Sequence, residues 1–155
     1  MTALTQKETI LLKDEKSHEE LCIKKYTKYS SEADDPALKQ LFSSILSHEQ
    51  QHLKTIDGIL NGQVPNMSQQ SQQNQGQSNS SSAAASNSGY SQKDSDLCQD
   101  ALSTEKYVSS TYNTSIFEFK DHNIRQALNH IQKEEQEHGE QIFNYMYQKG
   151  YYKPE

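Results

Sequence analysis

Ser47-His48-Glu49-Gln50-Gln51-His52 contains a Glu-x-x-His motif that occurs twice in the chain. The second copy is Glu135-x-x-His138, 86 residues later. Placing residues 10–62 on residues 96–148 without a gap gives 13 identities in 53 pairs. Unrelated segments of ordinary composition would share roughly three or four. The motif therefore belongs to a long internal repeat, and the repeated unit decides the fold.

The repeat also relates two residues upstream of each motif. Glu19 corresponds to Glu105, and Tyr26 corresponds to Tyr112. Each copy thus has a glutamate, a tyrosine seven residues later, and Glu-x-x-His thirty residues after the first glutamate. Such spacing within apolar residues that recur every three or four positions is typical of paired amphipathic helices.

Composition excludes several classes of protein. The chain has 155 residues, a length that favours one domain. No apolar run approaches the roughly 18 residues of a membrane span, and the N-terminus lacks the basic and apolar segments of a signal peptide. A net charge of −6 without a basic cluster argues against nucleic acid as a partner. We therefore expect synthesis in a cytoplasm, no membrane span and no nucleic-acid binding.

The periodicity predicts four helices, over residues 5–33, 36–60, 95–119 and 122–149. Asp35-Pro36 offers a capping aspartate followed by a proline at the first helical position, and Asp121 recurs at the same place in the second copy. The predicted units are a first helical hairpin (5–62), a second helical hairpin (95–150) and a short tail (151–155).

Residues 63–94 have a different composition, dominated by glutamine, serine and asparagine. Such a segment cannot bury enough apolar surface to order itself, so we expect a flexible, disordered linker. Its root-mean-square span of roughly 30 Å is close to the length of a 25-residue helix, about 37 Å. The linker can thus connect opposite ends of the bundle. The prediction is an all-α four-helix bundle of two duplicated hairpins, with the second and third helices parallel.

Four glutamates and two histidines are expected at one height in this bundle. In each antiparallel hairpin, Glu19 is as far from the turn as Glu49, and Glu105 as far as Glu135. All lie about 15 residues, or roughly 22 Å, from their turns. The motifs also interrupt apolar core positions. The candidate metal ligands are Glu19, Glu49, His52, Glu105, Glu135 and His138.

A buried cluster of carboxylates needs protons or cations. Burying one unpaired carboxylate costs several kcal/mol, and four repel one another. Two divalent cations would neutralise the four charges, and iron or manganese suits mixed carboxylate and imidazole ligands. The set resembles that of ferritin-like di-iron and di-manganese proteins. Two alternatives remain, namely a surface pattern left by duplication and a polar core without metal.

Tyr26 and Tyr112 lie two turns from the upstream glutamates, on the same helix faces. They are either aromatic core residues or hydrogen-bond partners that orient the ligand carboxylates.

Two segments of the second hairpin resemble a known family. They are Glu105-Lys106-Tyr107-Val108-Ser109-Ser110-Thr111-Tyr112-Asn113-Thr114 and Ile142-Phe143-Asn144-Tyr145-Met146-Tyr147-Gln148-Lys149-Gly150-Tyr151-Tyr152. Both are similar to the coat F family of bacterial spore coat proteins, and the similarity covers about 95 to 155. The first hairpin resembles a general ferritin-like or rubrerythrin-like half.

The resemblance implies a ferritin-like fold and a structural role in the endospore coat, reached from the mother-cell cytoplasm. Other spore coat proteins would be the partners, and a tyrosine-rich end (Tyr145, Tyr147, Tyr151, Tyr152) would suit packing or cross-linking there. The alternative is a di-iron or di-manganese oxidoreductase with catalase-, peroxidase- or ferroxidase-like activity. A long linker could also allow two chains to exchange hairpins in a homodimer.

Overall fold

The computed structural model describes residues 3–66 and 89–155 and consists of four helices. They are α1 (Gln6–Glu32), α2 (Pro36–Leu60), α3 (Gln92–Ile116) and α4 (His122–Lys149). No strand occurs in these two ranges. The all-α prediction is therefore confirmed, and the connection expected to be disordered lies mostly outside the described residues.

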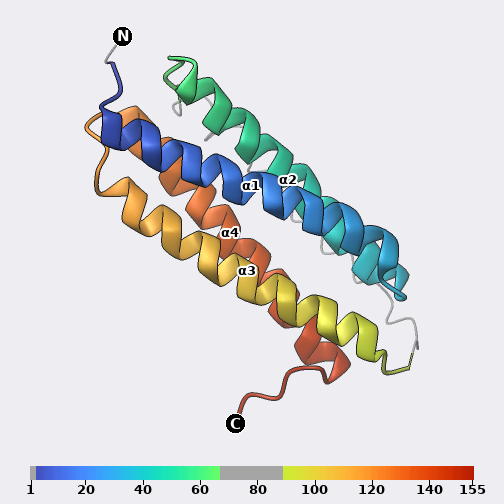
Figure 1. The fold of residues 1–155 in the computed structure, drawn as a ribbon. Coiled ribbons are helices and arrows are strands. Elements are labelled where there is room, and N and C mark those ends of the chain that lie inside the picture. Colours follow the sequence, from blue (N-terminus) through green and yellow to red (C-terminus); the bar gives the residue numbers. More distant parts are fainter. Residues whose placement is uncertain (1–2, 67–88) are drawn as a thin grey trace.

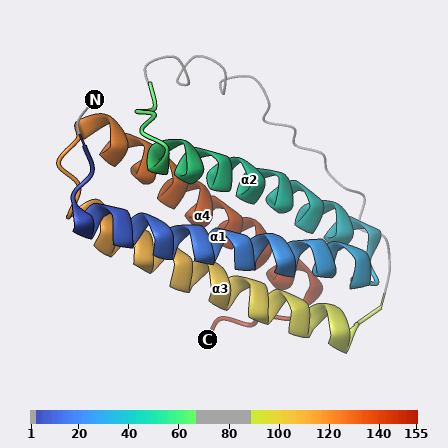
Figure 2. The ribbon, with the colours of Figure 1, turned by 45° about the horizontal axis from the view of Figure 1, so that its top comes forward.

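The helices pack as two antiparallel hairpins laid side by side (Figure 1). α1 pairs with α2 and α3 pairs with α4, while α1 also contacts α3 and α2 contacts α4. The start of α3 lies at the turn of the first hairpin, where the Ser91 hydroxyl donates to Asp34 at 2.8 Å. α2 and α3 consequently run in the same direction on opposite corners of the bundle, as predicted (Figure 2).

Capping side chains fix all four helix starts. Thr5 and Glu8 form a reciprocal capping box at the start of α1. Asp35 accepts from the backbone of Ala37 at 2.9 Å, and Asp121 accepts from Asn123 at 2.8 Å, so both predicted caps are confirmed. These caps satisfy backbone donors that the first helical turn leaves free.

The predicted limits of the third helix were about three residues too late at both ends. The helix begins at Gln92 because the Ser91 side chain caps it, accepting from the backbone of Asp94 at 3.2 Å. It ends at Ile116, and Phe119 is buried in the following connection instead. The last three residues assigned to the linker, 92–94, are therefore helical.

Two buried acids join the hairpins at their ends in a reciprocal way. Asp94 accepts from the backbone nitrogens of Asp34 and Asp35, at 2.7 and 3.0 Å. Glu8, its counterpart in the repeat, accepts from the backbone nitrogen of Lys120 at 2.8 Å. Each hairpin thus binds the turn of the other, which fixes the height of one repeat against the other.

The predicted apolar stripes form one core. Its largest buried side chains are Tyr26, Tyr112, Phe42, Phe119, Leu12, Leu38, Ile45, Ile56, Ile59, Leu128, Ile131 and Ile142. Cys22 and Cys98 are buried free thiols, consistent with small apolar packing residues. Among the described residues, none of the helices has the length and hydropathy needed to cross a membrane.

Candidate metal centre

All six candidate ligands lie in the core, and each helix contributes to the set. α1 provides Glu19 and α3 provides Glu105. α2 and α4 each provide a Glu-x-x-His pair. None of the six side chains is more than 2% exposed. Burial of all six side chains excludes a surface pattern left by duplication. A buried metal site and a polar core without metal both remain compatible with it.

The six residues divide into two groups of four that share two glutamates. One group is Glu19, Glu49, His52 and Glu135, and the other is Glu49, Glu105, Glu135 and His138. Within each group, one potential ligand atom per residue lies within 4.8 Å of the others. Glu49 and Glu135 belong to both groups, so they lie between two adjacent positions that could each hold a cation.

Each imidazole faces the shared carboxylate of the opposite hairpin. His52 Nδ1 lies 3.1 Å from Glu135 Oε1, and His138 Nδ1 lies 3.0 Å from Glu49 Oε1. The two rings are 5.9 Å apart between centroids. The geometry follows the two-fold relation of the repeats, and in both cases Nδ1 is the nitrogen directed at the centre.

Several buried polar atoms at the centre make no well-oriented hydrogen bond among the described residues, although two of them, His138 Nδ1 and Glu49 Oε1, lie only 3.0 Å apart. They are Glu19 Oε2, both carboxylate oxygens of Glu49, His52 Nε2, Glu105 Oε2, Glu135 Oε2 and His138 Nδ1. Leaving one such group unsatisfied costs about 1–3 kcal/mol, and more if it is charged. Once deprotonated, these atoms are Lewis bases of the kind that iron and manganese accept as ligands. The residues present therefore fit a pair of divalent metals.

Burial and contacts divide the four carboxyl groups into two kinds. Burial raises the pKa of Glu19 and Glu105 well above the usual range. Burial also opposes the charge on Glu49 and Glu135, but contacts with neighbouring carboxyl and imidazole groups outweigh it and lower the pKa of both. The residues shared by both positions are thus the ones that hold negative charge most readily.

The same contacts favour the charged form of the imidazoles. Burial alone would lower the pKa of His138, but its contacts with Glu105, Glu135 and Glu49 raise it to about 11. The pKa of His52 is raised for the same reason. In the metal-free centre, protons on the imidazoles thus offset negative charge on the carboxylates. Metal binding must then displace protons, as is general for such ligands.

Tyr26 and Tyr112 bond the terminal glutamates across the hairpins. The Tyr112 hydroxyl donates to Glu19 Oε1 at 2.6 Å, and the Tyr26 hydroxyl donates to Glu105 Oε1. In both cases the second oxygen, Oε2, makes no hydrogen bond to any residue in 3–66 or 89–155. Each tyrosine therefore fixes one oxygen of a carboxylate and leaves the other available, which favours the orienting role over a purely apolar one.

We expect Tyr112→Phe to weaken metal binding at one position only. The phenylalanine keeps the ring but removes the donor to Glu19, and loss of such an orienting partner typically costs 10–100-fold in metal affinity. Metal titration followed by calorimetry would show one weakened and one unchanged step. Tyr107→Phe, on the exposed face of the same helix, is the control, and equal behaviour of both variants would contradict the orienting role.

His48 and Glu134 are partners of the imidazoles that the sequence reading missed, because both positions lie off the apolar stripes. His48 Nδ1 lies 2.9 Å from Nε2 of His138. Glu134 Oε1 lies 3.6 Å from Nε2 of His52, and 2.6 Å from His130. Only 17% of the Glu134 side chain is exposed. The two residues correspond in the repeat, which is the signal that could have linked them.

Glu15 is a further buried acid beside the centre. Its two carboxylate oxygens accept from Ser115 Oγ at 2.8 Å and from Thr111 Oγ1 at 3.0 Å. Burial raises its pKa to about 7, against the lowering effect of these two hydrogen bonds. Its repeat counterpart is Ala101, so this acid breaks the symmetry of the bundle.

We expect Glu15→Gln to stabilise the metal-free protein increasingly as pH rises. The native state retains the Glu15 proton up to about pH 7, whereas the unfolded chain loses it near 4.5, so stability falls with rising pH in this window. Glutamine removes that loss, on the order of 3 kcal/mol. Urea unfolding of both proteins at pH 4.5 and pH 8 would measure it. A stability difference that is the same at both pH values would contradict the buried-acid account.

The fold and the site together define a class: a four-helix bundle with a buried carboxylate–histidine centre assembled from two repeats. Residues 93–155 match the Coat F domain family. This part contains nearly all of α3 and all of α4, and therefore Tyr112 and three of the six candidate ligands. The search of curated proteins and the search of solved structures gave no match.

The match confirms the resemblance of the second hairpin to the spore coat F family. The resemblance of the first hairpin to ferritin-like or rubrerythrin-like proteins stays a prediction.

Proposed function

We propose that the protein is a structural component of the bacterial endospore coat, built around a di-metal core. The Coat F match over residues 93–155 carries the coat assignment. The unpartnered oxygen and nitrogen atoms of the buried centre support the metal. Other coat proteins are the proposed partners.

Two iron or manganese ions would be held by the six candidate ligands, with Glu49 and Glu135 shared between them. Bound metals would link all four helices through one set of contacts, and would offer Lewis-acid and redox chemistry. The protein's own contribution is to exclude water and to orient the carboxylates through Tyr26 and Tyr112. For a coat subunit, the main consequence is resistance of the bundle to unfolding.

Fractionation of mature spores tests the coat assignment. An epitope-tagged chain, expressed from its own promoter in the spore former that carries it, is expected in the alkali- and detergent-extractable coat fraction. Recovery from the spore core or from the mother-cell lysate alone would contradict the proposal. A Glu49→Gln/Glu135→Gln variant in the same assay would show whether the centre is needed for assembly.

The tyrosine-rich end divides into two exposed and two anchored residues. Tyr147 is 60% exposed and Tyr152 is 38% exposed. In contrast, the Tyr145 hydroxyl donates to Asp35 at 2.8 Å, and the Tyr151 hydroxyl accepts from the backbone of Ser91 at 3.2 Å. Of these four tyrosines, we propose that the exposed Tyr147 and Tyr152 contact a neighbouring coat protein.

We expect Tyr147→Phe/Tyr152→Phe to increase extraction of the protein from the coat, because both exposed hydroxyl groups are lost without a change in the bundle. Tyr145→Phe/Tyr151→Phe is the matched control and should mainly lower stability, since its hydroxyls bond within the chain. Quantitative blotting of graded extracts measures both effects. If the Tyr147→Phe/Tyr152→Phe variant is extracted as the wild type is, these two tyrosines do not contribute to packing in the coat.

A di-iron or di-manganese oxidoreductase is the second candidate function. One observation favours it: a cavity in the second hairpin reaches two of the candidate ligands.

A further inference from the structure

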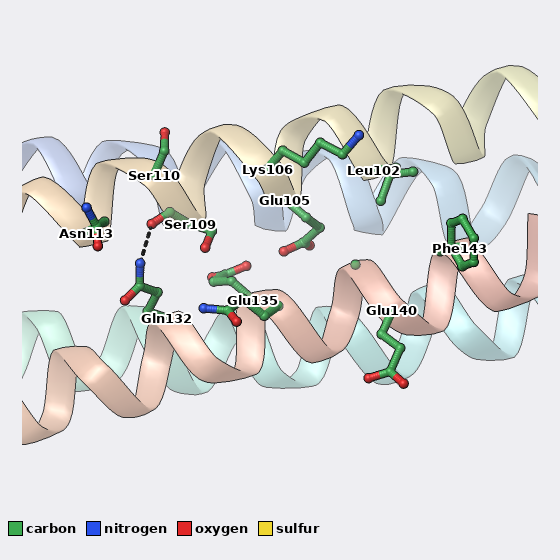
Figure 3. A pocket seen from close by; sticks show the side chains of 12 residues that line it. Leu102, Glu105, Lys106, Ser109, Ser110, Asn113, Gln132, Glu135, Glu140 and Phe143 are labelled. Carbon is green, nitrogen blue, oxygen red and sulfur yellow. Dashed lines mark hydrogen bonds between the residues drawn. The ribbon is translucent and has the colours of Figure 1, made fainter. Parts of the chain in front are cut away.

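A cavity of about 560 Å³ lies between α3 and α4. Figure 3 shows Glu105 and Glu135 at its middle, with their carboxyl groups directed toward each other from the two helices. Leu102 and Phe143 lie toward one end. At the other end Gln132 donates to the backbone carbonyl of Ser109 at 2.9 Å. The cavity thus has a mouth on the outer face of the second hairpin and a floor of two candidate ligands.

The floor of the cavity carries two oxygen atoms that could bind a metal. Glu105 Oε2 and Glu135 Oε2 are buried and lack hydrogen-bond partners among the described residues. Both glutamates line the cavity and belong to the centre, and at most 2% of either residue is exposed, so they themselves form the layer between the two. A small molecule at the floor would lie against the position formed by Glu105, Glu135 and His138.

The repeat allows the same region of the first hairpin to be compared directly. At the offset of 86 residues, Gly139 corresponds to Leu53, and Ser109 corresponds to Ile23. Leu53 and Ile23 are both half-buried. Large apolar side chains therefore occupy, between α1 and α2, the positions that the second hairpin leaves to a glycine and a serine.

An ion pair lies at one end of the same region in the first hairpin. Lys16 and Asp57 pair between α1 and α2 at 2.7 Å, and their counterparts in the repeat are Leu102 and Phe143. The second hairpin has no such link there, because both residues are apolar. The two hairpins share the ligand pattern but differ in the side chains above it.

Building on the proposed metal centre, we infer that small ligands reach the metal pair from one side, through the cavity between α3 and α4. The side chains of Ile23 and Leu53 close the opposite side. The expected ligand is a small oxygen-containing molecule of the peroxide or dioxygen class, because it must pass between helices and bind a carboxylate-rich metal pair. Gly139 and Ser109 keep the route open.

Gly139 offers a graded test. A Cβ atom there would lie 3.8 Å from Leu102 Cδ1 and 4.0 Å from Glu105 Cβ, which are ordinary contacts. Gly139→Ala should therefore fold and leave the cavity open. Gly139→Leu introduces the residue of the first hairpin and extends over the floor, and Ser109→Ile does the same from α3. Ser103→Ile, at an exposed position of α3, is the control for the added bulk.

Azide is the probe, titrated into the iron-loaded, oxidised protein and followed by its absorption band. Metal content is measured first in every variant. We expect Gly139→Leu and Ser109→Ile to retain iron but bind azide about tenfold more weakly or worse, whereas Gly139→Ala and Ser103→Ile bind it as the wild type does. If circular dichroism shows that Gly139→Leu does not fold, the azide affinity of Ser109→Ile alone tests the route.

Two failures have different meanings. Unchanged azide affinity in the iron-loaded Gly139→Leu and Ser109→Ile variants would overturn access through this cavity and leave the metal centre intact. Absence of iron and manganese from the wild-type protein would overturn the proposed centre itself, and with it the route.

Discussion

Loading the metal-free protein with Fe²⁺ or Mn²⁺ is expected to raise its Tm by roughly 20–30 °C. A ligand that binds only the folded state adds about 4 kcal/mol of stability at 1,000 times its Kd, so two positions add about 8 kcal/mol. Each kcal/mol shifts the Tm of a domain of this size by about 3–4 °C. The reason for the large effect is that six buried side chains from all four helices meet at the same place.

Differential scanning calorimetry of the chelator-treated and reloaded protein measures this shift. The stabilisation should weaken in acid, because the ligands must lose protons before they bind metal. The double variant Glu49→Gln/Glu135→Gln should show almost no response to metal. An equal, small shift in the wild type and the double variant would mean that metal binds elsewhere.

Glu135→Gln is expected to abolish tight metal binding at both positions, whereas Glu19→Gln should weaken only one. Glu135 belongs to both groups of ligands, while Glu19 belongs to one. Glutamine keeps the shape but loses the charge that two cations share. We expect a loss beyond the 10–100-fold typical of an outer hydrogen-bond partner. Metal analysis after dialysis should give no tightly bound ions for the first variant and one for the second.

Glu137→Gln is the matched control, since this residue is exposed on the same helix. It should retain both ions. If Glu135→Gln and Glu19→Gln each lose one ion, the two glutamates are equivalent and the shared position of Glu135 is wrong.

The fold could be predicted largely from the repeat. A Glu-x-x-His pair set into an apolar stripe at helical spacing can be buried only if its partners are at the same height. Glu19 and Glu49 are equally far from the turn in the sequence, which indicates that they lie at the same height in the hairpin. The length of the linker allowed the two hairpins to pair with the second and third helices parallel, and the structure shows that parallel course of α2 and α3.

The rest depended on details that a helical pattern does not contain. The start of α3 is set by Ser91 and by the bonds of Asp94 to the first turn, neither of which has a periodic signal. The role of Glu134 depends on its side chain reaching back toward His52. Gly139 is one of the residues that line the cavity, and its missing side chain becomes informative only beside its counterpart in the repeat, Leu53.

Anomalous diffraction from crystals of the natively purified protein, recorded at the iron and manganese edges, tests the central claim most directly. The account predicts two adjacent peaks in the core, one beside Nδ1 of His52 and one beside Nδ1 of His138, with Glu49 and Glu135 contacting both. No peak in the core after reconstitution with either metal, or peaks confined to surface acids, would contradict it.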